Sequence, residues 1–282
     1  MEEEDMERRI DRELYDEEKR EKDYDLLKTV EEVFDSFTIR SLYELARKVN
    51  IRKITGVISS GKEARIYRGI DREGQELAIK IYLTFSAEFK KSISKYIVGD
   101  ERFEKAKITS TRKLMSLWAK KEYSNLKKMF SSGVRVPKPI AQRDNIVVME
   151  FIGKDGNRAP LLKEIGGNLE DPQRIYEEIL ENVKKMVCKG ELVHADLSEY
   201  NIMIFEGTPV IIDVSQSVLL SHPNAEEFLK KDIMNIDRFF KRTHGIKPIG
   251  ETILEEELLE CLKKEREELY LSKYSNRSHQ RE

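Results

Sequence analysis

The amino-acid sequence predicts an α+β protein of two lobes, in which an antiparallel sheet with one key helix precedes a mostly helical part. Two observations favour this fold class. Short segments rich in Ile, Val and Tyr, separated by Gly-containing turns, fill much of the first half. Helical periodicity dominates the second half. We place the lobes at residues 51–152 and 153–282, after a charged arm and helix over 1–50. Two such lobes often hold a ligand between them.

The charge of the chain is unevenly distributed. The 282 residues carry a net charge of −2, yet the first 25 contribute −7 and the rest +5. Charged residues make up 37% of the sequence, compared with about 25% in ordinary globular proteins. This excess is typical of a protein that works at high temperature or simply of a highly solvated surface. The acidic arm is either a solvated helix or disordered, because it has no hydrophobic period.

The sequence offers little sign of export or of membrane insertion. Cys188 and Cys261 are the only cysteines, which indicates neither a disulfide framework nor a cysteine-based zinc site, so we expect both to pack in the core. No apolar run approaches the ~20 residues that cross a bilayer. The acidic N-terminus lacks an apolar signal region. We therefore expect a cytoplasmic protein with no membrane partner.

The first lobe begins with a helix and three strands. "SLYELARKV" is amphipathic, and Ser41 with Glu44 predicts a capping box at its start. "ITGVI", "ARIYRGI" and "LAIKIYL" then alternate with turns, which favours three antiparallel strands. "DREGQ" at 71–75 is a natural hairpin connection. Residues 84–110 show no clear period and contain many Lys and Arg side chains, so we expect a flexible basic insertion there.

The remaining elements are mostly helical. The pattern predicts a helix near 111–130, and "NIVVMEFIG" reads as a buried strand followed by a loop. "PQRIYEEILENVKKMV" predicts a second amphipathic helix with Pro172 in its first turn. Two short strands, "NIMIF" and "PVIIDV", flank a turn at 206–208. From about Asn224 the chain reads as helical, with a break at "THGIKPIG".

Two fragments of the first lobe suggest phosphate chemistry. In "TGVISSGKEARIYRG", Gly56 and Gly61 bracket a tight strand–turn–strand whose amides could lie over phosphates. A Walker A loop is excluded, because Glu63 follows Lys62 and a strand, not a helix, follows the turn. A plain hairpin turn is the alternative. In "LAIKIY", Lys80 interrupts an apolar run, where an unpaired ammonium is costly; the alternative is an exposed edge strand.

The predicted 111–130 helix supplies an acidic partner for that lysine. Glu122 lies one turn from both Trp118 and Leu126, on the apolar seam of the helix. A carboxylate there requires a cation, and Lys80 is the obvious candidate. The alternative is a glutamate that reaches solvent at the margin of the seam.

The second lobe contains the most distinctive motif. "VHADLSEYNIM" places Asp196 and Asn201 five residues apart, and in "VIIDVSQ" Asp213 emerges at the end of an apolar strand. Their oxygens suit magnesium, which accepts few protein ligands in addition to substrate phosphates. We expect His194 to hold the turn through a hydrogen bond rather than to take part in catalysis. Protein kinases have their motifs in the same order along the chain: a Gly-containing loop, a lysine, a glutamate on a helix, H-x-D-x-x-x-x-N and an aspartate.

"HADLSEYNIM", "IIDVSQSV" and "SSGKEARIY" closely resemble the RIO kinases, and specifically their archaeal-like type 1 subfamily. The resemblance runs from about Ile51 to Phe240. It implies a two-lobed protein-kinase-like fold with a truncated second lobe. The fifty mostly charged residues before it do not resemble the winged-helix domain of the type 2 members.

The resemblance also implies roles for individual residues. Asp196 would orient the attacking hydroxyl and accept its proton, Asn201 and Asp213 would hold Mg²⁺ (or Mn²⁺), and Asp213 would carry an acyl-phosphate intermediate. The residues implied in ATP binding are Ser59, Ser60, Gly61, Lys62, Lys80, Glu122, Met149, Glu150 and Ile152.

Some features depart from ordinary protein kinases but match the RIO pattern. Ala195 stands at the position of the catalytic-loop arginine, and Ser215 at that of the glycine in D-F-G. No A-P-E motif follows, and 42 residues separate Lys80 from Glu122. These features make an ordinary peptide substrate doubtful.

The leading hypothesis is therefore an ATP- and magnesium-dependent serine/threonine kinase or ATPase that acts in maturation of the small ribosomal subunit. Its partners would be ATP and a subunit precursor of protein and rRNA, with the basic insertion 84–110 either contacting RNA phosphates or merely solvated; no DNA partner is expected. One alternative is an ATPase switch that gates release from precursor particles with little protein phosphorylation. A small-molecule phosphotransferase and a catalytically inactive scaffold are further alternatives, against which "DVSQ" and the intact motifs argue.

Overall fold

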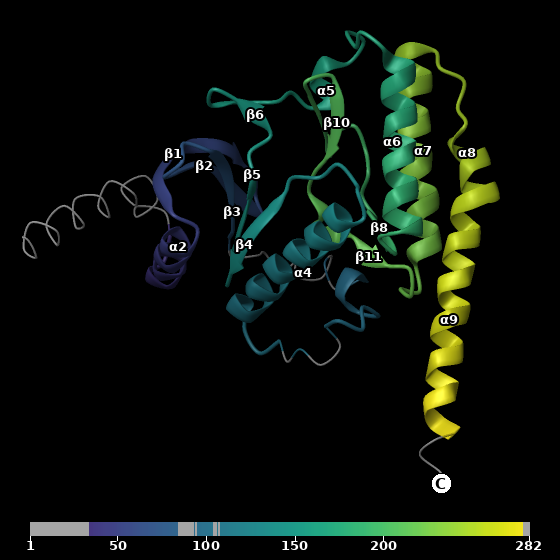
Figure 1. The fold of residues 1–282 in the computed structure, drawn as a ribbon, viewed down its shortest axis with the longest axis horizontal. Coiled ribbons are helices and arrows are strands. Elements are labelled where there is room, and N and C mark those ends of the chain that lie inside the picture. Colours follow the sequence, from purple (N-terminus) through teal and green to yellow (C-terminus); the bar gives the residue numbers. More distant parts are fainter. Residues whose placement is uncertain (1–33, 84–92, 94, 104–105, 107, 279–282) are drawn as a thin grey trace, which may run out of the picture.

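The computed structural model describes residues 34–83, 93, 95–103, 106 and 108–278. Five antiparallel strands form the first lobe in the order β1-β2-β3-β5-β4 (Figure 1). Their bounds are β1 Ile51–Ser60, β2 Ala64–Asp71, β3 Glu76–Tyr82, β4 Pro139–Arg143 and β5 Ile146–Glu150. The three predicted antiparallel strands are thus confirmed, and the tight turn after β1 leads into a strand as expected.

The helix α2 (Ser36–Lys48) covers one face of this sheet and begins earlier than the sequence suggested. Its N-cap is Asp35, whose carboxylate accepts the Thr38 amide at 2.8 Å. The predicted capping box at Ser41 is wrong. Ser41 lies inside the helix; its hydroxyl donates to Asp144 Oδ2 at 2.7 Å and lies 3.0 Å from the Phe37 carbonyl. A better cap residue six positions upstream starts the helix first.

The helix α4 (Thr111–Ser131) packs against β4 and β5 and reaches the second lobe (Figure 1). Ser110 caps it. Its buried seam contains Leu114, Trp118 and Leu126, as the periodicity predicted. Three polar side chains of the helix are also buried: Lys121, Glu122 and Asn125.

The second lobe consists of long helices around short strand pairs. The principal helices are α6 Pro172–Cys188, α7 Ala225–His244 and α9 Leu259–Ser278, with short α5 Leu162–Ile165 and α8 Gly250–Ile253 and a π turn at Leu254–Leu258. The strand pairs are β6 Gly153–Lys154 with β7 Asn157–Arg158, β8 Leu192–Val193 with β11 Val218–Leu219, and β9 Ile202–Phe205 with β10 Thr208–Ile211. Pro172 lies in the first turn of α6, as predicted.

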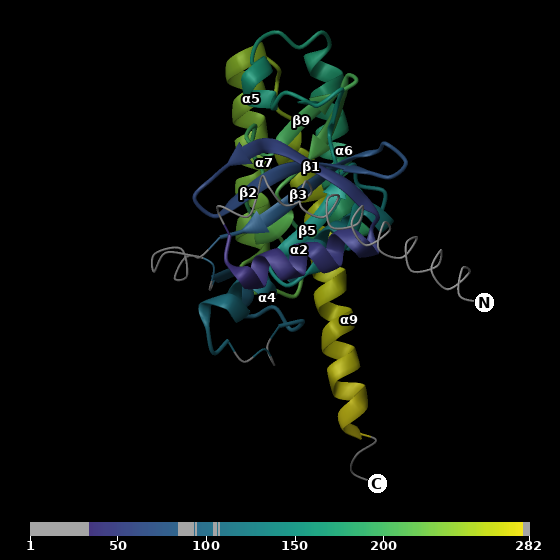
Figure 2. The same cartoon turned by 90° about the vertical axis from the view of Figure 1, so that its left-hand side faces the viewer.

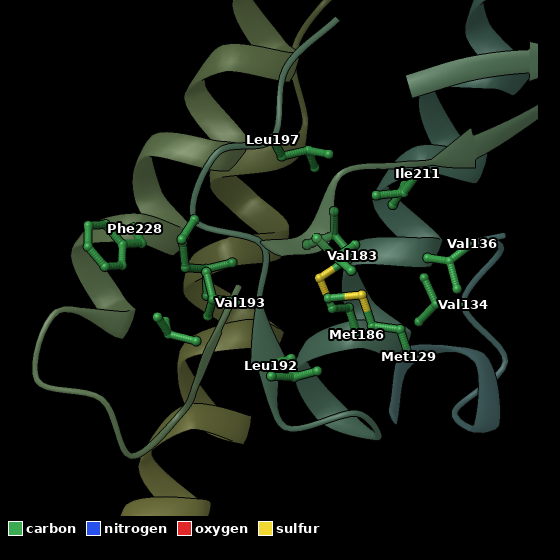
Figure 3. Close-up of a cluster of buried hydrophobic side chains, with 14 of the residues drawn as sticks. Met129, Val134, Val136, Val183, Met186, Leu192, Val193, Leu197, Ile211 and Phe228 are labelled. Atoms are coloured by element: carbon green, nitrogen blue, oxygen red, sulfur yellow. The ribbon is translucent and has the colours of Figure 1, made fainter. Parts of the chain in front are cut away.

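A continuous apolar core supports the loop between β8 and β9. Val193 and Leu197 are fully buried and lie among side chains of several elements, including Met186, Ile211 and Phe228 (Figure 3). The polar residues between Val193 and Leu197 are therefore held on a packed base. In contrast, α9 extends well beyond the body of the molecule (Figures 1 and 2).

Part of the region expected to be a flexible insertion is packed. Ile93, Tyr96, Ile97 and Phe103 are buried in the main core. The Lys95 and Val98 carbonyls lie 3.0 Å from Nε2 of His222, just before α7. The expectation of a solvated loop is wrong for these residues. Their aromatic and aliphatic side chains lie close together in the sequence and pack into the core as a group. Lys90 and Lys91 lie outside the described residues, as do residues 1–33, which include the acidic arm.

The two cysteines also differ from expectation. Cys188 ends α6 and Cys261 lies in α9, and they form a disulfide with Cα atoms 5.2 Å apart. We predicted independent packing in the core, because two cysteines 73 residues apart give no sequence signal of pairing. The C-terminal end of α6 is in contact with the start of α9, which brings the two cysteines together. No helix in the described part of the chain is long and apolar enough to cross a membrane.

Candidate active site

A cleft of about 410 Å³ lies between the sheet and the second lobe. Its wall includes the turn between β1 and β2, the middle of β3, and the segment that follows β5. The opposite side is formed by the loop before β9 and the residues after β10. Predicted nucleotide-binding residues that line it are Ser59, Gly61, Lys62, Lys80, Glu122, Met149, Glu150 and Ile152. Ser60 does not line it.

Lys80 is held at the centre of the cleft by two carboxylates. Its ammonium donates to Glu122 Oε1 at 2.7 Å and to Asp213 Oδ1 at 2.9 Å. The predicted pair with Glu122 is therefore present, and both side chains are buried. Burial alone would lower the pKa of Lys80, but the carboxylates of Asp213 and Glu122 raise it well above its usual value. Lys80 thus remains a cation.

Tyr82 is a member of this cluster that the sequence analysis missed. Its hydroxyl donates to Glu122 Oε2 at 2.6 Å, so both carboxylate oxygens of Glu122 are occupied. Tyr82 lies two residues after Lys80 on the same strand, and alternate residues of a strand share a face. This two-residue spacing was the sequence signal that could have placed Tyr82 beside Lys80.

The loop between β8 and β9 presents Asp196 and Asn201. The Asn201 amide donates to the Asp196 carbonyl at 2.8 Å, which closes the loop. Nε2 of buried His194 lies 3.1 Å from the Ile212 carbonyl, in line with the structural role expected for this residue. Burial raises the pKa of Asp196. Gln216, another residue missed, donates to Asp196 Oδ2 at 3.3 Å.

Asp213 connects the two sides of the cleft and has an unusual backbone. Its φ of 55° and ψ of 61° place it in the left-handed region, which costs a non-glycine residue about 1–2 kcal/mol. Oδ1 accepts from Lys80 and from the Ser215 hydroxyl at 3.0 Å. Burial raises the pKa of Asp213, but the Lys80 ammonium outweighs this effect and holds it below the usual value. The side chain is 50% exposed, towards the cleft.

The donor set of this cleft fits a magnesium ion. Among the described residues, Asp213 Oδ2 and Asn201 Oδ1 have no hydrogen-bond partner, and both residues line the cleft. Magnesium prefers oxygen ligands and usually takes only one or two from the protein. In the same part of the chain no group of three or more His, Cys, Asp or Glu side chains could hold a metal ion.

A buried aspartate on α7 fixes the loop that carries Asp196. Asp232 accepts the Ala195 amide at 2.8 Å and the Leu197 amide at 2.7 Å. Ala195 has a φ of 68°, a strained value that these bonds hold in place. Burial raises the pKa of Asp232 to about 8. Asp232 could not be recognised from the sequence, because a single Asp within a helix has no pattern of its own.

A second buried polar cluster lies behind Asp213. Asn125 of α4 donates to the Val214 carbonyl at 2.8 Å and to the Ser217 carbonyl at 3.0 Å. Lys121 donates to the same Ser217 carbonyl. Arg102 donates to Asn125 Oδ1 at 2.9 Å and binds the Asp100 carboxylate. The segment after Asp213 is therefore attached to the same helix that carries Glu122.

These features together define a class of protein. They are those of a protein-kinase-like phosphotransferase. They comprise the sheet, the helix that carries a lysine-bound glutamate, and the loop with Asp196 and Asn201 facing Asp213. The match to the RIO domain family covers residues 65–251. The chain belongs to the RIO family.

Comparisons with individual proteins place it among the Rio1 kinases of that family. It is 39% identical over 248 residues to the RIO-type serine/threonine-protein kinase Rio1 of Haloferax volcanii, covering 88% of this chain and 83% of that protein. The Methanocaldococcus jannaschii Rio1 is 40% identical, with 83% and 79% covered. The human serine/threonine-protein kinase RIO1 is also 40% identical, but this chain spans only 38% of its length.

Solved structures agree with this assignment. The structure of a Rio2 kinase–ADP/Mg²⁺–phosphoaspartate complex from Chaetomium thermophilum superposes with a TM-score of 0.58 at 25% sequence identity. The match covers 75% of this chain and 62% of that one. The chain is thus an ATP-dependent phosphotransferase with the fold of RIO kinases.

Proposed function

We propose that this protein transfers the γ-phosphoryl group of ATP, bound with Mg²⁺, to serine or threonine hydroxyls of a protein substrate. The observation that carries the proposal is the convergence on Lys80. One ammonium from the first lobe contacts Glu122 of α4 and Asp213 of the second lobe. A cation fixed at this point can bind nucleotide phosphates. Asp196 does not itself line the cleft, but it is hydrogen-bonded to Asn201, which does, and from there it would receive a hydroxyl proton.

The remaining roles follow from position. The amides of the turn at Ser59, Gly61 and Lys62 would cover the phosphates. Ser60 would stabilise that turn without lining the cleft. The backbones of Glu150 and Ile152 would meet the adenine, with Met149 near its edge. Asn201 and Asp213 would hold the metal, for which Mg²⁺ is the first choice and Mn²⁺ an alternative; the ion would neutralise charge on the phosphates.

An ATPase switch is a second candidate function, and one observation favours it. The Asp213 carboxylate faces the cleft with Oδ2 unpaired among the described residues. It could attack the γ-phosphorus of ATP, break the bond to ADP and form an acyl phosphate, which water would hydrolyse to the carboxylate and inorganic phosphate. The phosphoaspartate in the Rio2 complex supports this route.

The wider role is proposed from the resemblance to type 1 RIO kinases. The partner would be a precursor of the small ribosomal subunit, and the location would be the cytoplasm. Residues 51–152 and 153–282 would be the two lobes, and the arm and helix over 1–50 would precede them. The insertion would lie between β3 and α4, where Ile93, Tyr96, Ile97 and Phe103 are buried.

Turnover of γ-labelled ATP with Mg²⁺ tests the proposal. Wild type, Asp196→Asn and Asp213→Asn would be assayed alone, with a generic protein substrate, and with small-subunit precursors. A kinase transfers label to protein serine or threonine, and Asp196→Asn reduces this transfer by about 10²-fold or more. A switch releases free phosphate through a hydroxylamine-labile protein adduct that Asp213→Asn abolishes. Absence of turnover by wild type would contradict both candidates.

A further inference from the structure

A second groove lies beside the loop that carries Asp196, and it shares one lining residue, Tyr200, with the nucleotide cleft. It has a volume of about 620 Å³ and lies between Ser198–Tyr200 and the C-terminal half of α7. Arg238 and Arg242 line it from the helix. The two arginines are four residues apart, so both project from one face of α7. The groove therefore places two guanidinium groups next to the catalytic loop.

The charge of this groove is predominantly positive. Arg238 and Arg242 are exposed, and within the described part of the chain neither forms an ion pair. Lys163 lies 3.8 Å from the centre of the Tyr200 ring, at the edge of the groove. Glu199 is the one carboxylate among the lining residues in this part of the chain. Unpaired guanidinium groups present rigid forks of donors that match carboxylates and phosphates.

The groove is held in a fixed position relative to Asp196. Asp232 of α7 binds the amides on both sides of Asp196, as described above. Asn235, which lies on α7 between Asp232 and Arg238, donates to the Leu197 carbonyl at 3.1 Å. The groove wall at Ser198 is only two residues from Asp196. An extended chain advances about 3.3 Å per residue, so a substrate hydroxyl at Asp196 would have its near neighbours at the groove.

We propose that this groove binds an acidic side chain of the protein substrate, within about two or three residues of the serine or threonine that is phosphorylated. The inference rests on the proposed kinase function and names the substrate class. An acidic peptide fits better than RNA, because Glu199 would repel a continuous chain of phosphates, whereas a single carboxylate of a peptide can bind the arginines without contacting Glu199.

The test uses the full chain and matched peptides. One serine peptide carries Asp at the second and third positions on both sides of the serine, and its partner carries Asn at those positions. The variant R238Q/R242Q removes two positive charges from the groove. The control K241Q/K247Q removes two positive charges from exposed positions that do not line it. Steady-state kinetics give kcat and KM for each peptide and for ATP.

Wild type should prefer the Asp peptide by about tenfold in kcat/KM, mainly through KM, because one charge-assisted pair is worth about that factor. R238Q/R242Q should lose the preference with an unchanged KM for ATP, and K241Q/K247Q should keep it. Equal kcat/KM for both peptides in wild type, or a preference that survives in R238Q/R242Q, would overturn the proposal.

Direct binding separates this proposal from the kinase function. Fluorescence anisotropy, with ADP and Mg²⁺ present, compares the labelled Asp peptide, the Asn peptide and an RNA oligonucleotide of the same net charge. Tighter binding of the Asp peptide that is lost only in R238Q/R242Q supports the groove even if no phosphate is transferred. Equal binding of the two peptides, or tighter binding of the RNA, contradicts it.

Discussion

The ammonium of Lys121 and the carboxylate of Asp100 lie 3.8 Å apart, and neither side chain is exposed to solvent. Asp100 lies in the segment between β3 and α4, and Lys121 lies on α4, one residue before Glu122, so the pair joins these two parts of the chain. Arg102 also binds Asp100, so the carboxylate has two cationic neighbours. Because Lys121 and Asn125 both contact the Ser217 carbonyl, the cluster connects this region to the segment that follows Asp213.

The first prediction concerns stability and pH. Burial lowers the pKa of Lys121 from 10.5 to about 7. Between these values the unfolded chain binds this proton and the folded chain does not, so the free energy of unfolding rises with pH there. Below about pH 7 both the folded and the unfolded chain bind the proton, so Lys121 adds no pH dependence there. We therefore expect the free energy of unfolding of wild type, relative to that of Lys121→Met, to rise with pH, measured by urea unfolding of both proteins at pH 6.5, 8 and 9.5; the comparison cancels the opposite slope from Asp232. The control Lys120→Met, at an exposed neighbour, should keep this rise; parallel curves for Lys121→Met and wild type would refute the prediction.

The second prediction concerns the position of Asp213. Asn125→Leu leaves the Val214 carbonyl without its side-chain donor and weakens the attachment of the Ser217 carbonyl. An unsatisfied buried acceptor costs about 1–3 kcal/mol, and small displacements of a catalytic group reduce rates strongly. We expect ATP turnover to fall by about tenfold or more at a temperature where the variant is folded. Ser124→Ala is the control. A variant with normal kcat and reduced stability would show that Asn125 serves folding alone.

The third prediction separates the two partners of Glu122. Glu122→Gln removes a charge that stabilises the Lys80 ammonium, so kcat/KM for ATP should fall by about 10²-fold. Tyr82→Phe removes only the hydrogen bond to Glu122 Oε2 and should lower kcat/KM by less than tenfold, with a loss of about 1–3 kcal/mol in stability. Kinetics and urea unfolding of both variants give the comparison. Equal kinetic effects would mean that the charge of Glu122 is not what matters.

The fourth prediction concerns the disulfide between α6 and α9. Its two cysteines are 73 residues apart, and a crosslink closing a loop of that size contributes about 2–4 kcal/mol. We expect dithiothreitol to lower the thermal midpoint of wild type. Cys188→Ser should have the same lowered thermal midpoint as reduced wild type, with or without dithiothreitol. A wild-type midpoint that is insensitive to full reduction, verified by thiol titration, would contradict the prediction.

Much of the fold could be predicted because local patterns determined it. The strands around Lys80 are rich in Ile, Val and Tyr and are separated by turns, and α4 and α6 carry apolar seams with recognisable first turns. The pairing of Lys80 with Glu122 followed from the cost of burying either charge alone. The resemblance to RIO kinases added the order of the motifs.

What could not be predicted depends on contacts between distant residues. Asp232 lies 37 residues from Ala195, and Asn125 lies 89 from Val214. Neither has a local pattern that distinguishes it from an ordinary helical polar residue. The disulfide and the packing of Phe103 likewise depend on how α6, α9 and the core come together. The N-terminus of α2 was misplaced because two capping residues competed and only one was considered.

The disulfide has a topological consequence. The chain from Cys188 to Cys261, closed by the sulfur bridge, is a covalent ring. Asp196, Asn201, Asp213 and the whole of α7 lie within it. A single proteolytic cut anywhere in this ring would therefore leave one molecule instead of two fragments. Such a nicked protein would migrate as intact chain on a non-reducing gel and separate into two bands only after reduction.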